Sequence, residues 1–511
     1  MSLPSAIELS GIDKHFGTVH ANRGVDMQIA RRSITGIVGE NGAGKSTLMS
    51  ILYGLYEADS GEIRVDGKAV RIRSPADALG CGIGMVHQHF LLIDSFTVLE
   101  NVVLGAEGGP LLHSGLQVAR QELQRLAREY GLGIDPDALV GSLSVGEQQR
   151  VEILKVLFRG ARILILDEPS AVLTPQETDQ LFDILRTLNR NGVTILLITH
   201  KLREIMALTD VIYVMRQGEV VAQRRTSETN PDELAELMVG RKVRLKLERH
   251  AAAPGGTILR AEQIEVRTRR GLKLLDGIDL ELRAGEIVGI AGVSGNGQSE
   301  LLQVLAGIRA PDAGRLVIGT RIVDAGHPAT PAEMRKLGLA HVPEDRRRQG
   351  LVIQFDAPES SILGYHENSP FSHRHLLDPP QVRDYCADLM QRFDVRPQRL
   401  DIPCGGFSGG NQQKIVLARE LSQQPRILLV GQPTRGVDIG AIERIHRELV
   451  AARDRGCAIL LVSSELDEIM ALSDRIVVMC AGRITGEVAA ADADERRLGL
   501  MMSNAAQDHA A

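Results

Sequence analysis

Apolar positions in this chain fall into short unbroken runs that alternate with longer stretches of helical periodicity. The runs at residues 34–38, 163–166 and 194–198 consist mostly of Ile, Leu, Val and Thr. Apolar runs of this length are typical of strands that are buried on both faces of a parallel sheet. Helical patterns occupy residues 118–130, 148–158 and 176–190. The alternation predicts an α/β fold with a mainly parallel central sheet.

The two halves of the chain repeat the same blocks in the same order. GIVGENGAGKST at 36–47 recurs as GIAGVSGNGQSE at 289–300, and LSVGEQQRVEILKVL at 143–157 recurs as FSGGNQQKIVLAREL at 407–421. Two further blocks, at 162–174 and 195–210, recur at 426–438 and 459–474. A repeat of this length predicts two tandem domains rather than a solenoid. We expect domains at 1–242 and 258–511, joined by an Ala/Pro/Gly-containing linker at 243–257.

Composition narrows the class of protein. The 511 residues are 43% hydrophobic and 24% charged, which is ordinary for a soluble globular protein, and the net charge of −6 lacks the basic excess of a nucleic-acid binder. The five cysteines are scattered without a CxxC pair, which favours a reducing compartment over a disulfide framework or zinc site. We see no signal-peptide pattern and no apolar run of bilayer length. Any role at a membrane would therefore need another chain to span it.

A phosphate-binding loop is predicted between the apolar run at 34–38 and a helical stretch at 47–56. The residues from Gly39 to Ser46 fit GxxxxGK[ST] in the strand–loop–helix context that this motif requires. Backbone N–H groups of such a loop and the helix N-terminus attract phosphate, so a chance Gly-rich turn is the weaker alternative. We expect Lys45 to reach the β- and γ-phosphates and the Ser46 hydroxyl to bind Mg²⁺. The predicted ATP-binding residues are Gly39, Glu40, Asn41, Gly42, Ala43, Gly44, Lys45, Ser46 and Thr47.

A pair of carboxylates follows the apolar run at 163–166. Asp167 stands at the predicted strand end, where it is expected to help hold Mg²⁺ together with Ser46. Glu168 is expected to polarise the attacking water. The alternative is an ordinary acidic turn, and the loop upstream favours the catalytic interpretation.

The segment LSVGEQ at 143–148 resembles the signature loop of ATP-binding-cassette (ABC) proteins, with Val145 where the first of two glycines is usual. The resemblance extends over nearly the whole chain and implies two P-loop NTPase domains, each with a helical subdomain. It also implies that Gln88 senses Mg²⁺ and the attacking water, that His200 contacts the γ-phosphate, and that Phe16 stacks on adenine. The structural alternatives are a solvated loop glutamine, a capped structural histidine and a core phenylalanine.

The second half has replaced most of these residues. In the aligned blocks Lys45, Gln88, Asp167, Glu168, His200 and Phe16 correspond to Gln298, Glu344, Gly431, Gln432, Ser464 and Arg269. A neutral Gln298 cannot neutralise phosphate charge, and Gln432 has no carboxylate. Loss of the general base alone costs about 10²–10⁴-fold in rate, so we expect this second site to be hydrolytically inactive.

The signature loop is better preserved in the second half than in the first. It keeps Ser408, Gly409 and Gly410, and Asp438 stands where the first half has Thr174. In the ABC family two cassettes pack head-to-tail around each nucleotide. The resemblance therefore implies one composite site, in which these four residues complete the loop of the first half.

Three functions compete for a chain of this kind: an importer ATPase, a soluble tandem-cassette translation factor, and a DNA repair or chromosome protein. The short linker and single complete site disfavour the translation factor, and the lack of CxxC insertions or long coiled coils disfavours the repair protein. Segments 143–169, 293–301 and 432–446 resemble the nucleoside branch of the simple-sugar/nucleoside importers, with ribose- or galactose-type import as the alternative.

The same resemblance implies the setting of the protein. ATP hydrolysis with Mg²⁺ would energise uptake through two transmembrane permease subunits, with an extracytoplasmic substrate-binding protein and no nucleic acid as partner. The chain would lie at the cytoplasmic face of the membrane. We expect residues 87–99 and the segment after Glu344 to face the permeases, with an ordinary apolar surface loop as the alternative.

Overall fold

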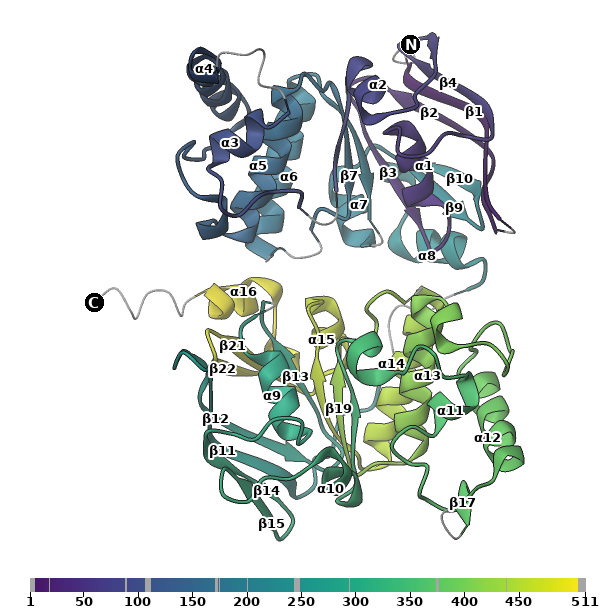
Figure 1. The fold of residues 1–511 in the computed structure, drawn as a ribbon, viewed down its shortest axis with the longest axis vertical. Coiled ribbons are helices and arrows are strands. Elements are labelled where there is room, and N and C mark those ends of the chain that lie inside the picture. Colours follow the sequence, from purple (N-terminus) through teal and green to yellow (C-terminus); the bar gives the residue numbers. More distant parts are fainter. Residues whose placement is uncertain are drawn as a thin grey trace. The chain divides into compact units, whose positions relative to one another are not determined.

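The computed structural model describes residues 5–17, 19–87, 90–105, 112–170, 173, 175–199, 201–242, 249–293, 295–373, 376–437 and 439–503. Its internal contacts divide the chain into two compact units, unit 1 (Met1–Val243) and unit 2 (Arg244–Ala511). The elements of both units are labelled in Figure 1. Within the described ranges no helix combines the length and the apolar character that crossing a bilayer requires.

Unit 1 is built around a six-stranded sheet with the order β10-β9-β3-β8-β7-β6. The strands are β3 (Ile34–Gly39), β6 (Ile83–Val86), β7 (Ile163–Asp167), β8 (Thr194–Ile198), β9 (Val211–Arg216) and β10 (Glu219–Arg225). All neighbours are parallel except β9 and β10, and every residue of β3 and β8 is buried. The three apolar runs are thus confirmed as strands of a mainly parallel sheet.

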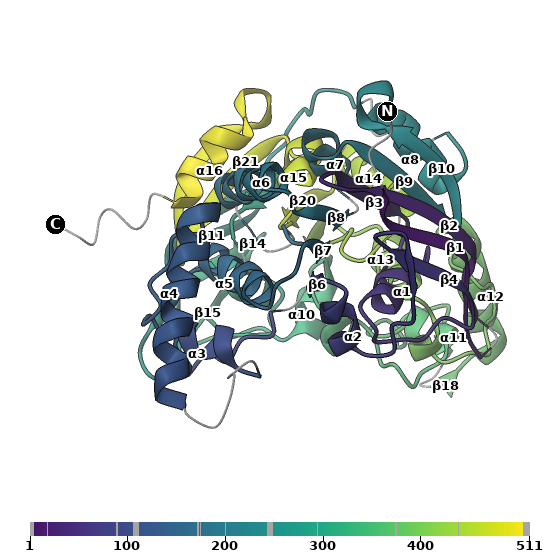
Figure 2. The ribbon, with the colours of Figure 1, turned by 90° about the horizontal axis from the view of Figure 1, so that it is seen from above.

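A second sheet of unit 1 is antiparallel, with the order β2-β1-β4-β5. Its strands are β1 (Ser5–Phe16), β2 (Val19–Ala30), β4 (Ser60–Val65) and β5 (Lys68–Val70). The helices of the unit are α1 (Lys45–Leu52), α2 (Pro75–Gly80), α3 (Val98–Val103), α4 (Leu112–Tyr130), α5 (Val145–Phe158), α6 (Pro175–Arg190), α7 (Leu202–Leu208) and α8 (Pro231–Val239), with 3-10 turns η1 (Val140–Ser142) and η2 (Thr226–Glu228). Helices α3, α4 and α5 lie on the opposite side of the six-stranded sheet from β1, β2 and β4 (Figures 1 and 2). These three helices form the predicted helical subdomain.

The helix after the phosphate-binding loop is shorter than the predicted stretch at 47–56. Helix α1 ends at Leu52, and Gly54 then takes a left-handed φ of 79°. A Cβ at this glycine would overlap the backbone of Ser74, so the turn that follows the helix requires glycine here. This close approach comes from a distant segment, which local periodicity does not report.

Unit 2 repeats the architecture. Its six-stranded sheet has the order β16-β19-β20-β13-β21-β22, which is the order of unit 1 read from the other edge. The strands are β13 (Ile287–Ala291), β16 (Leu339–Val342), β19 (Ile427–Gly431), β20 (Ala458–Val462), β21 (Arg475–Cys480) and β22 (Arg483–Ala489). The duplication inferred from the sequence blocks is therefore confirmed in the strand topology.

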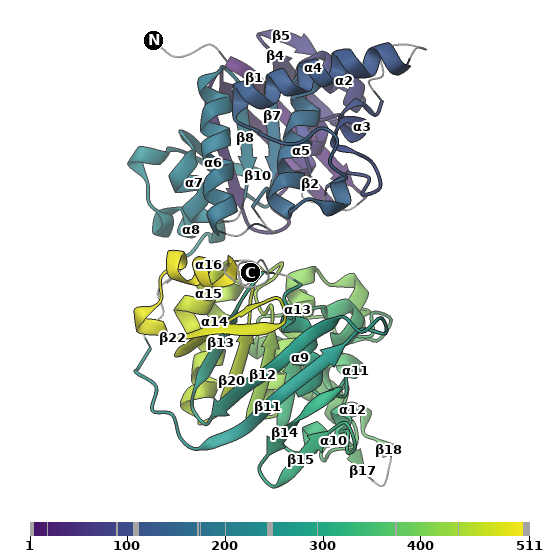
Figure 3. The same ribbon diagram turned by 90° about the vertical axis from the view of Figure 1, so that its left-hand side faces the viewer.

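The antiparallel sheet of unit 2, onto which Figure 3 looks, has the order β12-β11-β14-β15. The remaining strands are β11 (Thr257–Arg267), β12 (Lys273–Arg283), β14 (Ala313–Ile318), β15 (Arg321–Asp324), β17 (Ser372–His373) and β18 (Leu376–Leu377). The helices are α9 (Gln298–Leu305), α10 (Pro331–Lys336), α11 (Ala357–Ser361), α12 (Pro379–Arg392), α13 (Gly409–Ser422), α14 (Ile439–Asp454), α15 (Leu466–Leu472) and α16 (Glu495–Ser503), with the short turns η3 (Arg346–Gly350), η4 (Cys404–Gly406) and η5 (Ala490–Asp492).

The core of unit 2 has two apolar layers, one on each face of the six-stranded sheet. On β19, Ile427 and Leu429 belong to the layer shared with the antiparallel sheet, whereas Leu428 and Val430 belong to the layer under α12, α13 and α14. Successive strand residues point to opposite faces, so both faces need apolar side chains. This is why the strand reads as an unbroken apolar run in the sequence.

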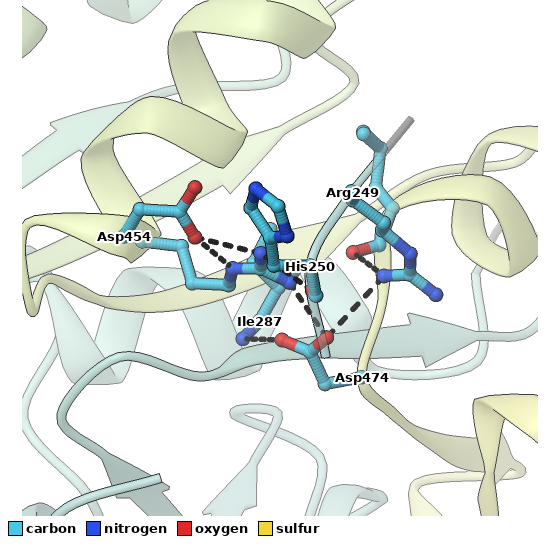
Figure 4. A network of polar contacts seen from close by, with 7 residues as sticks. Arg249, His250, Ile287, Asp454 and Asp474 are labelled. Carbon is cyan, nitrogen blue, oxygen red and sulfur yellow. Dashed lines mark hydrogen bonds and ion pairs between the residues drawn. The ribbon is translucent and has the colours of Figure 1, made fainter. Parts of the chain in front are cut away.

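Two residues within the segment predicted as a linker, Arg249 and His250, are hydrogen-bonded to unit 2 (Figure 4). The Arg453 side chain, 1% exposed, donates to Asp474 at 2.9 Å and to the backbone oxygen of His250 at 3.1 Å. Arg249 donates to the same carboxylate at 3.3 Å, and the N–H of Ile287 at the start of β13 donates to it at 2.9 Å. A buried cation needs such partners, so residues 249–250 form part of this unit rather than a free tether.

Candidate nucleotide site

The phosphate-binding loop of unit 1 lies between β3 and α1 and is shaped by two close backbone approaches. A Cβ at Gly39 would overlap the backbone oxygen of Met215 on β9. Gly44, the N-cap of α1, has φ 96°, and a Cβ there would overlap the backbone oxygen of Ala21. The loop is therefore folded tightly against β2 and β9, and its helix begins with free N–H groups that suit an anion.

Lys45 folds back over this loop. Its Nζ donates to the backbone oxygens of Gly39 at 2.7 Å and Glu40 at 3.0 Å, and the residue is only 7% exposed. Burial lowers the pKa of Lys45, while the carboxylates of Glu168, Asp167 and Glu40 act in the opposite direction. A desolvated cation at the mouth of a phosphate loop is stabilised further when a polyanion binds.

Asp167 ends β7 beside the loop. Burial and the neighbouring Glu168 raise its pKa, against the opposing effects of Lys45 and of a hydrogen bond from Ser46. The two carboxylates and the serine hydroxyl supply the oxygen donors that a divalent cation prefers. The residues therefore fit a Mg²⁺ ion, which would relieve the unfavourable charge that the raised pKa reports.

Glu168 is held by a constrained backbone. Its φ is 47°, in the left-handed region, and its N–H donates to the backbone oxygen of Ile198 at 2.8 Å. Such a conformation costs a non-glycine residue about 1–3 kcal/mol and is frequent at active sites. The hydrogen bond to β8 fixes the point at which this side chain leaves the sheet.

Phe16 stands at the end of β1 and is 41% exposed, so it is not the core residue that the structural alternative proposed. Its ring meets Tyr56 edge-on, with centroids 5.0 Å apart, and the Lys14 ammonium lies 5.6 Å from the ring centroid. An exposed, supported ring is suited to stacking, and its contact with adenine stays a prediction.

Three predicted site residues, Gln88, His200 and Asp438, lie outside the described residues. Among the described residues, Glu204 of α7 accepts hydrogen bonds from the hydroxyls of Ser170 and, at 3.2 Å, Thr199. Sequence reasoning missed Glu204. A usable signal existed, because both halves contain the letters EIMAL at this point.

Unit 2 keeps the loop backbone while changing its chemistry. Gly297, the N-cap of α9, has φ 100°, and the N–H of Asn296 donates to Val293 at 3.2 Å, as the N–H of Ala43 donates within the first loop at 3.0 Å. Gln298 takes the position of Lys45 and is 5% exposed. The loop can thus still present N–H groups to an anion, but without the cation.

Gln432 and Ser464, which replace the expected water-polarising and γ-phosphate-sensing residues, bind each other. The Gln432 Oε1 accepts the N–H of Ser464 at 3.2 Å and its hydroxyl at 3.0 Å. Gln432 has φ 49°, and its N–H donates to Val462 at 2.7 Å, so the backbone is that of Glu168. An amide engaged in this way offers no general base, which agrees with the predicted loss of hydrolysis.

A family model described as ABC transporter matches residues 22–171 and 275–435. The chain belongs to the ABC transporter family. The predictions of two tandem cassettes with a P-loop NTPase fold and of ATPase activity are confirmed.

The chain is similar to proteins named for import over nearly its full length. The nucleoside import ATP-binding protein NupA of Lactococcus lactis subsp. cremoris is 44% identical, covering 98% of this chain and 99% of that protein. The guanosine import ATP-binding protein NupO of Bacillus subtilis is 45% identical, covering 99% and 98%. A glucose import ATP-binding protein of Haloferax volcanii is 44% identical, covering 97% and 95%. A solved ATP-binding cassette of an ABC transporter in its ADP conformation is 27% identical, with a TM-score of 0.42, and covers 46% of this chain and 99% of that chain.

The signature loops of the two ABC cassettes begin equivalent helices. Ser144 is the N-cap of α5 and forms a capping box with Glu147, whereas Ser408 is the N-cap of α13 with a neutral Asn411 as its partner. The guanidinium of Arg346 lies against Gly409, so a side chain at this position, such as that of Val145 in the first cassette, would require the arginine to shift. The next residue, Gly410, is buried in the first turn of α13.

Proposed function

We propose that this ABC protein hydrolyses ATP to energise the import of nucleosides. The observation that carries the proposal is the similarity, 44% and 45% over nearly the whole chain, to proteins named for nucleoside and guanosine import. A relative named for ribose import is less similar, at 39%. The nucleoside resemblance of the sequence segments supports the same choice.

The first cassette supplies the chemistry in this proposal. Lys45 neutralises phosphate charge, and the backbone N–H groups of the loop hold the phosphate oxygens. Ser46 and Asp167 hold Mg²⁺, which when bound would neutralise charge on the transferred phosphate. The Glu168 carboxylate, fixed at the end of β7, accepts a proton from the attacking water. The predicted roles of Gln88 and His200 belong to the same proposal.

The second cassette is proposed to complete this site. Ser408, Gly409, Gly410 and Asp438 would face the nucleotide that the first loop binds. The two halves support this assignment because each preserves what the other has lost. The first half keeps the phosphate loop and has an altered signature, whereas the second half keeps the signature and has an altered phosphate loop. The degenerate half is then indispensable for hydrolysis.

The partners are proposed to be two transmembrane permease subunits and an extracytoplasmic substrate-binding protein, with the chain on the cytoplasmic face of the membrane. The segment at 87–99 carries exposed apolar side chains at Leu91 (62%) and Ile93 (38%). In the second cassette the segment after Glu344 carries Ile353 (41%) and Phe355 (37%). Exposed apolar side chains in equivalent loops are suited to docking on a partner.

Import of a simple sugar is the second candidate, favoured by the glucose import relative at 44% identity. The test is uptake of labelled nucleosides, ribose and glucose by cells with and without the gene. We expect nucleoside uptake alone to be lost, and to be restored by the wild-type chain but not by Glu168→Gln. Loss of sugar uptake with nucleoside uptake intact would overturn the nucleoside assignment.

A further inference from the structure

The two signature loops differ in what their backbone N–H groups meet. In the first cassette the N–H of Gly146 donates to the Oε1 of Glu177, the third residue of α6, at 3.3 Å. The third residue of the equivalent helix α14 is Ala441, which has no carboxylate. The first-turn N–H groups of α13 have no acceptor within their own helix. Those of Gly409 and Gly410 are therefore suited to an anion that comes from elsewhere.

An arginine lies against the signature loop of the second cassette. Arg346 begins the turn η3 after β16, and its Nη2 is packed on Gly409. Its Nη1 donates to the backbone oxygen of Arg435 at 3.0 Å, which holds the guanidinium between the signature loop and the loop after β19. Its Nε is buried and has no hydrogen-bond partner in the part of unit 2 that the structure describes. A half-buried cation with an unused donor is a group that an anionic ligand would stabilise.

The surroundings of Arg346 add positive charge rather than neutralise it. Burial lowers the pKa of this guanidinium, Arg347 and Arg435 lower it further, and Asp345 acts in the opposite direction. The Asp345 carboxylate already accepts the backbone N–H groups of Arg347 at 3.0 Å and Arg348 at 3.1 Å. Cations held close together repel one another, and an anion at the loop would relieve that repulsion.

This positive charge is specific to the second cassette. Three positions around its signature loop carry a more positive residue than the aligned positions of the first cassette: Arg346, Arg435 and Asn411, in place of Phe90, Ala171 and Glu147. Even with Asp438 in place of Thr174, the loop gains positive charge. The first signature loop has acidic partners of its own, whereas the second, which keeps both glycines, is arranged to receive a negative charge.

We propose that Arg346 and Arg435 form, with the N–H groups of the second signature loop, a binding site for the γ-phosphate of ATP. A planar guanidinium can donate two parallel hydrogen bonds to phosphate oxygens, which an ammonium or a serine hydroxyl cannot do. Arg346 donates to this phosphate and balances the negative charge spread over its oxygens during transfer. The inference rests on the proposed role of the second signature loop in completing the nucleotide site, and it adds a cation that the signature residues themselves do not supply.

The test compares ATP with ADP on the full-length chain. Arg346→Ala should lower kcat/KM for ATP by about 10–100-fold, because one charge-assisted contact is lost. The inhibition constant of ADP should not change, because ADP has no γ-phosphate for the site to bind. Arg348→Ala, at an exposed arginine of the same turn, is the matched control and should equal the wild type in both measurements. Thermal unfolding of each variant checks the fold.

Chemical rescue distinguishes a phosphate contact from a structural one. Guanidinium ion at non-denaturing concentration should restore part of the turnover of Arg346→Ala, because it can occupy the space that the side chain has left. It should not restore the turnover of Ser408→Ala. An Arg346→Ala chain that matches the control, that loses ATP and ADP affinity equally, or that guanidinium leaves unchanged would overturn the inference.

The variant Ser408→Ala separates this inference from the proposal on which it rests. If Ser408→Ala lowers turnover and Arg346→Ala does not, the arginine assignment alone is wrong. If neither lowers turnover, the second signature loop does not complete the site, and both are wrong. Should Arg346→Ala fail to fold, Arg435→Ala, at an exposed position, is expected to lower kcat/KM for ATP with the ADP inhibition constant unchanged. Unaltered turnover in that variant would overturn the inference.

Discussion

The two phosphate loops of this protein share a backbone and differ in chemistry. Gly44 and Gly297 have φ values of 96° and 100°, and Glu168 and Gln432 have φ values of 47° and 49°. The side chains at the reactive positions have nevertheless changed from ionised to neutral. A nucleotide-binding scaffold and a hydrolytic site are therefore separable, because backbone N–H groups form the first and a few charged side chains form the second.

The strained residue Glu168 has a counterpart in the second cassette, Gln432. A left-handed φ at Glu168 alone would suggest strain kept for catalysis. Gln432 keeps the same conformation without a carboxylate, and both N–H groups bond to the neighbouring strand, at 2.8 Å and 2.7 Å. The strain thus belongs to the strand-to-loop connection of the fold, and catalysis uses a direction that the fold already provides.

The largest expected difference between the cassettes is in hydrolysis. Glu168→Gln should lower ATPase activity by about 10²–10⁴-fold, because the amide cannot take a proton from water. Gln298→Ala, in the other loop, should leave most of the activity. Steady-state ATPase assays on both variants, with nucleotide binding as a folding check, measure the contrast. Equal losses in the two variants would contradict a single hydrolytic site.

The next effect concerns the loop backbone. Gly44→Ala places a Cβ on the Ala21 oxygen at a left-handed φ, which should cost about 2–4 kcal/mol. Gly42→Ala is the matched control, because its φ is 83° but no atom lies within 4 Å of the added Cβ, so only about 1 kcal/mol is expected. Denaturation midpoints of both variants test this. A Gly42→Ala chain as unstable as Gly44→Ala would mean that strain rather than overlap decides.

A smaller effect is expected when one residue of the first cassette is replaced by its counterpart from the second. Lys45→Gln removes a charge-assisted contact of about 1.5–3 kcal/mol, which corresponds to roughly 10–100-fold weaker ATP binding at this loop. The reciprocal Gln298→Lys should tighten nucleotide binding in the second cassette without adding turnover, because Gln432 is unchanged. Titration with a fluorescent nucleotide, alongside ATPase rates, measures both. New hydrolysis in Gln298→Lys would refute the assigned role of Gln432.

The smallest expected effect is a pH-dependent change in thermal stability when Asp167 is replaced. Because the pKa of Asp167 is raised, its ionised form is unfavourable in the ligand-free fold. Asp167→Asn should therefore melt above the wild type at neutral pH. The difference should shrink as the pH falls through the raised pKa, where the wild-type aspartate becomes protonated. Asp179→Asn, at an exposed carboxylate of α6, is the control. A lower melting temperature for Asp167→Asn at neutral pH would contradict the sign.

Local patterns in the sequence were enough to determine much of this protein. The apolar runs predicted the buried strands, because a strand with two covered faces needs apolar side chains at every position. Internal repetition predicted two tandem domains, and the GxxxxGK[ST] spacing located Lys45 and Ser46, because one strand–loop–helix unit contains the whole phosphate loop. The losses at Gln298 and Gln432 were equally visible in the aligned blocks.

What only the tertiary structure decided lies between strands that are distant in sequence. The turn after α1 requires glycine because Gly54 lies against the backbone of Ser74, and the bond between Ser299 and Glu344 joins residues 45 positions apart. Aligned blocks show Glu344 as the loss of a glutamine and Gly431 as the loss of an aspartate. Only the pairing of β16 with β19 brings Glu344 and Gly431 together, so that the glutamate side chain lies beside the glycine. Neither substitution alone reveals this contact.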